Sequence, residues 1–136
     1  MKIDEKTLIE YAKRAMKKSY SPYSGFSVGA ALLTSGGKIY SGCNIENASF
    51  TPTVCAERTA FFNAVSKGEN NFSAIAVVGG KKGGITEYCP PCGVCRQVMR
   101  EFCADDFEII LFDGKSVKKL KLEDILPFSF KPENLE

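Results

Sequence analysis

The sequence contains no histidine, the side chain that most often serves proteins as a general base or a metal ligand. Any metal or proton chemistry must therefore use cysteine, aspartate, glutamate or lysine. A strong charge of either sign is also missing, because 18 Lys and Arg residues against 16 Asp and Glu residues leave a formal charge of +2. So small an excess does not indicate a polyanionic partner, and we expect no nucleic acid as ligand.

Long apolar runs are absent as well. No stretch approaches the length of about 18 apolar residues that would indicate a membrane span, and residues 1–6 are charged rather than signal-like. We therefore expect a soluble, cytoplasmic protein with no membrane partner. In such a chain, six cysteines indicate metal binding or catalysis rather than the disulfide framework of a small secreted protein.

Hydrophobic periodicity predicts a single α/β domain over residues 1–136. Helices are expected after an Asp4 N-cap, from about Cys55 to Lys67 and from about Pro91 to Phe102. Strands are expected at residues 26–34, 38–43, 72–78, 107–112 and 117–122, with a short helical turn at 122–126. This order predicts a three-layer α-β-α sandwich around a mixed five-stranded sheet.

Two stretches outside the helices invite a functional interpretation. The glycine-rich segment 79–84 lacks the Gly-Lys-[Ser/Thr] ending of a phosphate-binding loop, so we expect a mobile surface loop. Four lysines gather near the last strand, at Lys115, Lys118, Lys119 and Lys121. Lysines on an edge strand commonly prevent unwanted strand pairing, which is the role we expect for them.

Two short motifs predict a zinc site. Cys55-Ala56-Glu57 begins one expected helix, and Cys92-Gly93-Val94-Cys95 follows Pro91 at the start of another. Residues three apart share a helix face, so Cys92 and Cys95 can hold one ion with Cys55 as the third ligand. Three protein ligands leave a fourth position open, as in catalytic zinc sites. We expect one Zn²⁺ per chain, with Glu57 moving protons.

The neighbouring charges and cysteines refine this prediction. Arg58 and the two helix N-termini are expected to draw charge from the thiolates. Cys89 forms a second Cys-x-x-Cys pair with Cys92, but two prolines hold it extended, so we exclude it from the ligands. A redox pair or two core cysteines are the alternative interpretations of the motif. Cys43 and Cys103 are expected to be small buried hydrophobic residues.

Together the motifs are similar to the zinc deaminase signature, in which [His/Cys]-x-Glu is followed by Pro-Cys-x-x-Cys. Within that superfamily the chain closely resembles the short, homotetrameric cytidine deaminases. The segments that carry the resemblance are 21–32, 44–50, 55–60, 91–97 and 126–130. It implies hydrolysis of cytidine and deoxycytidine to uridine and deoxyuridine with release of ammonia, in pyrimidine salvage. Zinc would activate the water that attacks C4, and Glu57 would shuttle the protons.

The resemblance also implies a set of substrate contacts. Phe26 would lie beside the base, and Asn44 and Glu46 would bind the ribose 3′ hydroxyl. From the residues alone, however, a surface carboxylate is the favoured interpretation of Glu46, and Asn44 is as well explained as a turn cap. Phe26 is by itself as well explained as a core residue.

Shared active sites in a homotetramer follow from the same resemblance. Phe130 would reach the base from a neighbouring subunit, and Phe50 with the Ala48 backbone would approach the ribose 5′ end. Many members carry tyrosine where this chain has Phe50. Any hydrogen bond from that hydroxyl is therefore lost here.

Two other functions remain as alternatives. A related small-molecule deaminase, such as a blasticidin-type enzyme, shares the zinc motifs, although Asn44, Glu46 and Phe130 argue against it. A non-enzymatic, zinc-stabilised binding domain is the other. Such a site would be closed by a fourth ligand, for which Cys89 is the one cysteine at suitable spacing.

Overall fold

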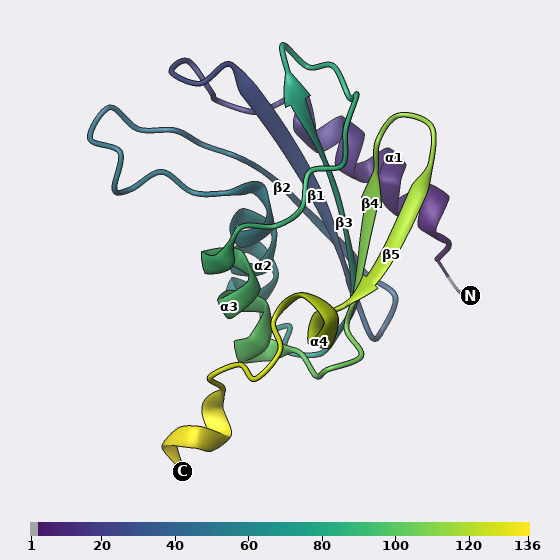
Figure 1. The fold of residues 1–136 in the computed structure, drawn as a ribbon, viewed down its shortest axis with the longest axis vertical. Coiled ribbons are helices and arrows are strands. Elements are labelled where there is room, and N and C mark those ends of the chain that lie inside the picture. The colour runs from purple at the N-terminus through teal and green to yellow at the C-terminus, as the bar shows by residue number, and fades with distance from the viewer. Residues whose placement is uncertain (1–2) are drawn as a thin grey trace.

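The computed structural model describes residues 3–136 (Figure 1). Its first half contains α1 (Glu5–Met16), β1 (Phe26–Thr34), β2 (Ile39–Cys43) and α2 (Ala56–Ser66). The second half contains β3 (Phe72–Lys81), α3 (Gly93–Phe102), β4 (Glu108–Phe112), β5 (Val117–Lys121), α4 (Leu122–Ile125) and a 3₁₀ helix (Pro132–Leu135). The Asp4 side chain accepts a hydrogen bond from the Thr7 amide and caps α1, as the sequence predicts.

The sheet has five strands in the order β2-β1-β3-β4-β5. β1 pairs antiparallel with β2 and β3, β3 pairs parallel with β4, and β4 pairs antiparallel with β5. A parallel pair requires a crossover connection, which α3 supplies between β3 and β4. The prediction of a mixed five-stranded sheet is confirmed, and Lys118, Lys119 and Lys121 lie on the edge strand β5 as expected.

Helices cover both faces of the sheet, with α1 on one side and α2 and α3 on the other (Figure 1). Alternate residues of the central strands supply the two cores, because successive strand side chains point to opposite faces. Ile75 and Val77 of β3 belong to the α2 side, whereas Ala76 and Val78 belong to the α1 side. The near-continuous apolar run of β3 therefore reflects burial on both faces, which confirms the three-layer sandwich.

Close backbone contact fixes α2 against the sheet at Gly42. A Cβ at this position would lie 2.5 Å from the amide nitrogen of Ala60 and 2.8 Å from the carbonyl oxygen of Ala56. Only glycine permits so close an approach. The first turn of α2, which carries Glu57, is therefore held directly on β2.

Three details differ from the sequence-based expectations. Gly79 and Gly80 are buried residues of β3 rather than part of a surface loop, and a Cβ on Gly80 would lie 1.6 Å from the Gly84 carbonyl oxygen. These glycines serve close packing instead of mobility. The third helix begins at Gly93, two residues later than predicted, because Cys92 is still extended. Cys43 is half-buried, whereas Cys103 is buried as expected.

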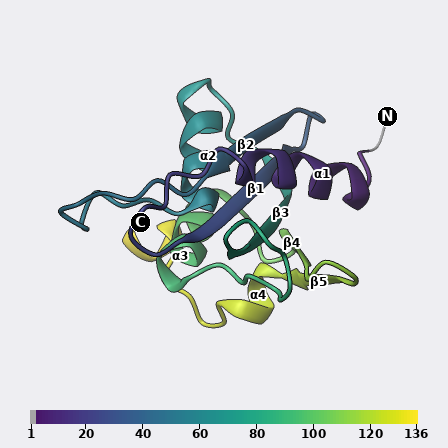
Figure 2. The same cartoon turned by 90° about the horizontal axis from the view of Figure 1, so that it is seen from above.

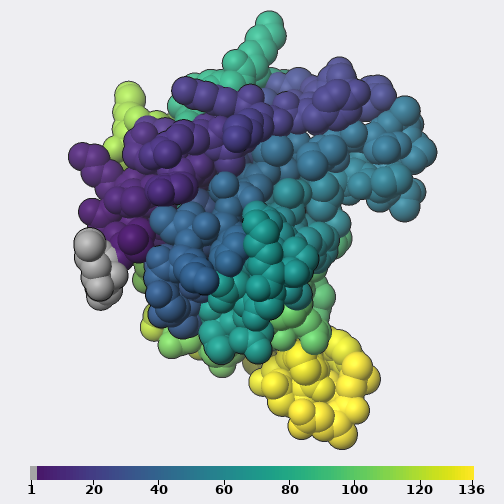
Figure 3. All heavy atoms as spheres, turned by 180° about the vertical axis from the view of Figure 1, so that it is seen from behind, coloured from purple at the N-terminus to yellow at the C-terminus, as the bar shows by residue number. Residues whose placement is uncertain are grey.

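Two segments project from the sandwich. The connection between β2 and α2 extends away from the sheet (Figure 2), and the chain after α4 forms a separate lobe at the C-terminus (Figure 3). Both carry exposed aromatic side chains, at Phe50, Phe128 and Phe130. Within residues 3–136, no helix combines the length and the apolar character needed to cross a membrane.

Candidate active site

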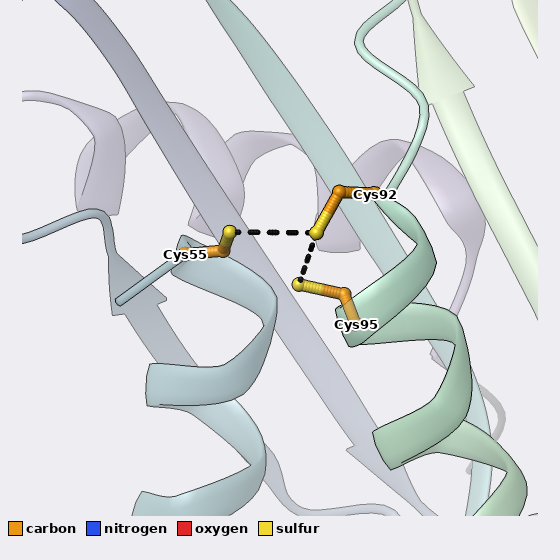
Figure 4. A group of neighbouring side chains, drawn as sticks. All are labelled: Cys55, Cys92 and Cys95. Atoms are coloured by element: carbon orange, nitrogen blue, oxygen red, sulfur yellow. Dashed lines mark hydrogen bonds between the residues drawn. The ribbon is translucent and has the colours of Figure 1, made fainter. Parts of the chain in front are cut away.

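Three cysteines from two helix N-termini form one cluster (Figure 4). The Sγ atoms of Cys55 and Cys92 lie 3.8 Å apart, and those of Cys92 and Cys95 lie 3.6 Å apart. A tetrahedral zinc ion with Zn–S bonds of about 2.3 Å would hold its sulfurs about 3.8 Å from one another. The donor set and its spacing therefore fit zinc.

Helix starts position these thiols. Cys55 is the N-cap of α2 and Cys92 is the N-cap of α3, both with extended backbone, while Cys95 lies in the first turn of α3. Free amides and the helix dipole give a helix N-terminus a partial positive charge. Thiolates are stabilised at such positions. Burial differs across the cluster, since Cys95 is buried and Cys92 is exposed.

Arg58 supplies the nearest formal positive charge. Its guanidinium donates a hydrogen bond of 3.3 Å to the Sγ atom of Cys55. The pKa of Cys55 falls to about 5, because Cys95 donates a hydrogen bond to its sulfur and Arg58 adds another. The same Cys95–Cys55 contact, together with burial, raises the pKa of Cys95. The cluster therefore stabilises at least one thiolate even before a metal adds its charge.

Glu57 lies two residues beyond Cys55, in the first turn of α2, and only 4% of its surface is exposed. Burial raises its pKa to about 7, with a smaller contribution from the charge on Cys55. A carboxyl group with a pKa near neutrality can both accept and release a proton. The protein thus places a buried carboxyl group with a raised pKa beside the thiol cluster.

Cys89 is near this cluster but outside it. Its Sγ atom would lie 2.9 Å from a Cβ on Gly79. Burial raises the pKa of Cys89 to about 12, and the negative charges of Glu57 and Cys55 add to the effect. Cys89 is therefore a neutral thiol that packs against β3. A fourth sulfur ligand is not provided by the described part of the chain, in which Cys55, Cys92 and Cys95 are the group found within metal-binding distance of one another.

Phe26 connects the cluster to the start of β1. The position of a Gly79 Cβ is 3.2 Å from the Phe26 ring and 2.9 Å from the sulfur of Cys89. The charges of Glu57 and Cys55 contribute to the raised pKa of Cys89, so Cys89 lies near the thiol cluster. Phe26 adjoins the same Gly79 position as Cys89 and therefore lies at the same end of the sheet. This placement is compatible with a ring that lines the site.

Asn44 binds the first residues of β1, and Glu46 binds the segment that precedes this strand. Asn44 accepts a hydrogen bond from the Val28 amide and donates one to the Phe26 carbonyl oxygen. Glu46 accepts hydrogen bonds from the amides of Tyr23 and Ser24 and from the Ser24 hydroxyl. Both side chains therefore have structural roles. The role of Asn44 resembles the turn cap that its sequence position suggested.

The remaining candidates lie on the projecting segments. Ala48 and Phe50 are exposed in the connection between β2 and α2, where Phe50 adopts a φ of 65° and its ring packs edge-on against Tyr23 at 6.2 Å. Phe130 is 59% exposed in the C-terminal lobe. Within residues 3–136 of one chain, none of the hydrogen bonds of the thiol cluster involves these residues.

Arg96 and Gln97, which follow Cys95 in α3, have structural roles that the sequence does not predict. Arg96 donates hydrogen bonds to the carbonyl oxygens of Pro91 and Ile125, and Gln97 donates one to the carbonyl oxygen of Phe130. Arg96 thus ties α4, and Gln97 the C-terminal lobe, to the helix that carries Cys95. Their position directly after Cys95 was visible in the sequence, but their partners are distant along the chain.

An open cluster of thiolates with a buried carboxyl group beside it, set on an α-β-α sandwich, defines the class of zinc-dependent hydrolases with a catalytic metal. The model of the cytidine and deoxycytidylate deaminase zinc-binding region matches residues 2–111 of this chain. The chain therefore belongs to the cytidine and deoxycytidylate deaminase family, and zinc is its cofactor.

Individual relatives agree with this assignment. A cytidine deaminase from Sporosarcina psychrophila is 46% identical over 134 residues, which is 98% of this chain and 96% of that relative. The crystal structure of a cytidine deaminase from Burkholderia pseudomallei superimposes with a TM-score of 0.86 at 45% identity and covers 94% of this chain and 100% of its own. A cytidine deaminase structure from Mycobacterium tuberculosis has a TM-score of 0.81 at 36% identity and covers 95% and 98% of the two chains.

Proposed function

We propose that this protein hydrolyses cytidine and deoxycytidine to uridine and deoxyuridine with release of ammonia. The observation that carries the proposal is the cluster of Cys55, Cys92 and Cys95 with the buried Glu57 beside it. Zinc held by these thiolates supplies the Lewis acidity that makes a water molecule acidic near neutral pH. The chain's own side chains supply proton transfer, charge balance and substrate binding.

Glu57 carries the protons in this proposal. It removes one proton from the water that attacks C4 of the cytosine ring and delivers that proton to N3. It then takes the second proton from the hydroxyl group formed on C4 and delivers it to the departing amine, so that the C4–N bond breaks as the C4 carbonyl forms. Its location in the first turn of α2 fixes the carboxyl group relative to Cys55. Burial excludes bulk water, so that the transferred proton stays between Glu57 and the substrate.

Arg58 adjusts the charge of the site. Three thiolates on one Zn²⁺ give a formal charge of −1, which would weaken the ion as a Lewis acid. The hydrogen bond from Arg58 to Cys55 draws electron density from one sulfur, and the N-termini of α2 and α3 act in the same direction. This charge balance is our proposed role for Arg58.

For the substrate, we propose that Phe26 lies against the base and that Asn44 and Glu46 bind the ribose 3′ hydroxyl. Phe26 is at the thiol-cluster end of β1. Asn44 donates a hydrogen bond to the Phe26 carbonyl oxygen, and Glu46 accepts hydrogen bonds from Tyr23 and Ser24 in the segment that precedes Phe26. Phe50 and the Ala48 backbone would border the ribose 5′ end from another subunit. Phe50 offers an apolar wall there without a hydroxyl group.

We further propose a homotetramer in which Phe130 of one subunit completes the site of another. Exposed aromatic residues support this assembly, because Phe128 is fully exposed and Phe130 is 59% exposed. A second apolar surface lies on α2 and α3, where Phe62 is 50% and Val94 57% exposed. Large exposed apolar groups of this kind mark association surfaces.

The cellular role we propose is pyrimidine salvage in the cytoplasm. A reducing compartment keeps thiols available for a metal, which suits a site built from three cysteines.

Side-by-side deamination assays test the proposed function. The purified, zinc-loaded protein is incubated separately with cytidine, deoxycytidine, cytosine, cytidine monophosphate and blasticidin S, and the ammonia released is quantified. We expect turnover of the two nucleosides and little of the other compounds. Turnover of blasticidin S in preference to cytidine would instead identify the related antibiotic deaminase activity, and no turnover of any compound would support a binding domain.

A further inference from the structure

The Glu46 carboxylate is held by the short segment that precedes β1. Its Oε1 atom accepts hydrogen bonds from the amides of Tyr23 and Ser24, at 2.9 and 3.2 Å. Its Oε2 atom accepts a short hydrogen bond of 2.5 Å from the hydroxyl of Ser24. Ser24 is therefore the residue that contacts both carboxylate oxygens.

The same hydroxyl group also contacts Phe26. The Phe26 amide donates a hydrogen bond of 3.0 Å to the Ser24 Oγ atom, which in turn donates to Glu46. The Phe26 carbonyl oxygen accepts a hydrogen bond of 2.8 Å from Asn44. Ser24 thus links the backbone of the proposed base-binding residue to the side chain of the proposed sugar-binding residue.

Hydrogen-bond capacity shows what Glu46 can still bind. An ionised carboxylate has about four acceptor positions, two on each oxygen. Within the described part of the chain, Oε1 has two donors and Oε2 has one. One position on Oε2 is left, and the Ser24 hydroxyl determines which way that oxygen faces.

Charge favours the same arrangement. The hydroxyl of Ser24, followed by the backbone amides of Tyr23 and Ser24, holds the pKa of Glu46 below its usual range despite some desolvation. The carboxylate therefore stays an acceptor. It suits a ligand group that donates one hydrogen bond, as a sugar hydroxyl does.

We propose that Ser24 is a positioning residue for sugar recognition, whose hydroxyl orients Glu46 to accept the 3′ hydroxyl of the nucleoside and aligns it with Phe26. This inference rests on the proposed function. A structural role alone would make Ser24 equally important for every substrate. A positioning role makes it important only for substrates that carry the hydroxyl that Glu46 receives.

Steady-state kinetics with cytidine and 3′-deoxycytidine separate the two roles. We expect Ser24→Ala to lower kcat/KM for cytidine about tenfold, mainly through KM, because a hydrogen bond to a charged group is typically worth that much or more. For 3′-deoxycytidine the loss should be less than about twofold. Ser24→Thr keeps the hydroxyl and should restore the preference for cytidine.

Ser21→Ala is a matched control from the same segment. It removes a hydroxyl group that contacts Ser19 and Ser27 rather than Glu46. It should leave the ratio of the two substrates unchanged. Equal losses on both substrates in Ser24→Ala, or no loss on either, would overturn the proposal.

A double-mutant cycle gives a stricter test. If Ser24 acts through Glu46, then Ser24→Ala should cost little in a Glu46→Ala background, because the shared partner is already gone. A cost as large as in the wild-type background would contradict the positioning role.

Equilibrium binding of uridine and 3′-deoxyuridine separates this inference from the proposed function. Zinc-loaded wild-type protein should bind uridine more tightly, and Ser24→Ala should reduce that preference about tenfold. Failure to deaminate cytidine with this binding pattern intact would overturn the proposed function and leave the inference supported. Equal binding of the two nucleosides by the wild-type protein would overturn the inference.

Discussion

At the scale of single residues, Glu57 differs from every other carboxylate in the described chain by its burial. Only 4% of the Glu57 surface is exposed, whereas the other carboxylates of residues 3–136 lie at or near the surface. Burying a carboxyl group is unfavourable, because the charged form loses its contact with water. A buried carboxyl group therefore indicates a functional reason for its position. The proposed function supplies the reason, because in it Glu57 carries protons and must lie beside the water that attacks the substrate.

Replacement of Glu57 by glutamine tests that role. Glu57→Gln keeps the size of the side chain but cannot carry a proton, so we expect turnover to fall at least about a hundredfold. Zinc content and thermal stability should stay near those of the wild type. Zinc analysis and steady-state kinetics on the same preparation check this prediction. Full activity in a zinc-replete Glu57→Gln protein would show that another group moves the protons.

Cys89 provides a second residue-scale test, because its thiol is close to the cluster but neutral. Cys89→Ser should hold one zinc per chain, whereas Cys95→Ser, its matched control, should lose most of its metal. The reason is that Cys95 shares the cluster with Cys55 and Cys92, while Cys89 packs against Gly79. Metal analysis after gel filtration measures the difference. Similar zinc loss in both variants would support a closed, four-cysteine site.

At the scale of secondary-structure elements, the contact between β2 and α2 fixes the position of Cys55 and Glu57. Gly42→Ala places a Cβ 2.5 Å from the Ala60 amide, so α2 must shift. We expect a loss of about 1–3 kcal/mol in the free energy of unfolding, together with weaker zinc binding. Gly36→Ala is the control, because the nearest atom to its Cβ is 3.8 Å away. Thermal unfolding and zinc competition with a chelator measure both effects, and identical results for the two variants would contradict this prediction.

Element order and sheet type were predictable because they depend on local patterns. The apolar run of β3 and the Asp4 cap are each set within a few residues of sequence. The extension of β3 through Gly79 and Gly80 was not predictable, since it depends on close contacts with Gly84 and Cys89 that only the folded chain shows.

The candidate site also has one part that local sequence predicts and another part that depends on long-range contacts. Cys92 and Cys95 could be paired from their spacing, and Cys55 could be added because its Cys-x-Glu motif places another thiol, with a carboxyl group beside it, at a helix start. The hydrogen bonds from Ser24 to Glu46 and from Arg96 to Ile125 join residues 22 and 29 positions apart. Spacing within a motif carries no information about partners so distant in sequence.

At the scale of the whole molecule, sharing of active sites can be tested by subunit exchange. Glu57→Gln and Phe130→Ala proteins should each be impaired, the first in turnover and the second in KM. An aromatic side chain against a base is worth about 1–3 kcal/mol, so the Phe130→Ala defect should be measurable. Mixed tetramers that pair an intact Glu57 with an intact Phe130 from another chain should exceed the summed parental activities.

Two results would contradict this sharing. One is no recovery of activity despite exchange proven by mass spectrometry. The other is a fully active monomer by light scattering, which would show that each chain completes its own site.

The most direct test of the whole account is a titration of zinc into metal-free protein, with cytidine deamination measured at each zinc occupancy. The account predicts that uridine and ammonia form in equal amounts, and that activity rises linearly until one zinc is bound per chain and then stays constant. Cytidine deamination by the metal-free protein, or activity that continues to rise to two zinc ions per chain, would contradict it.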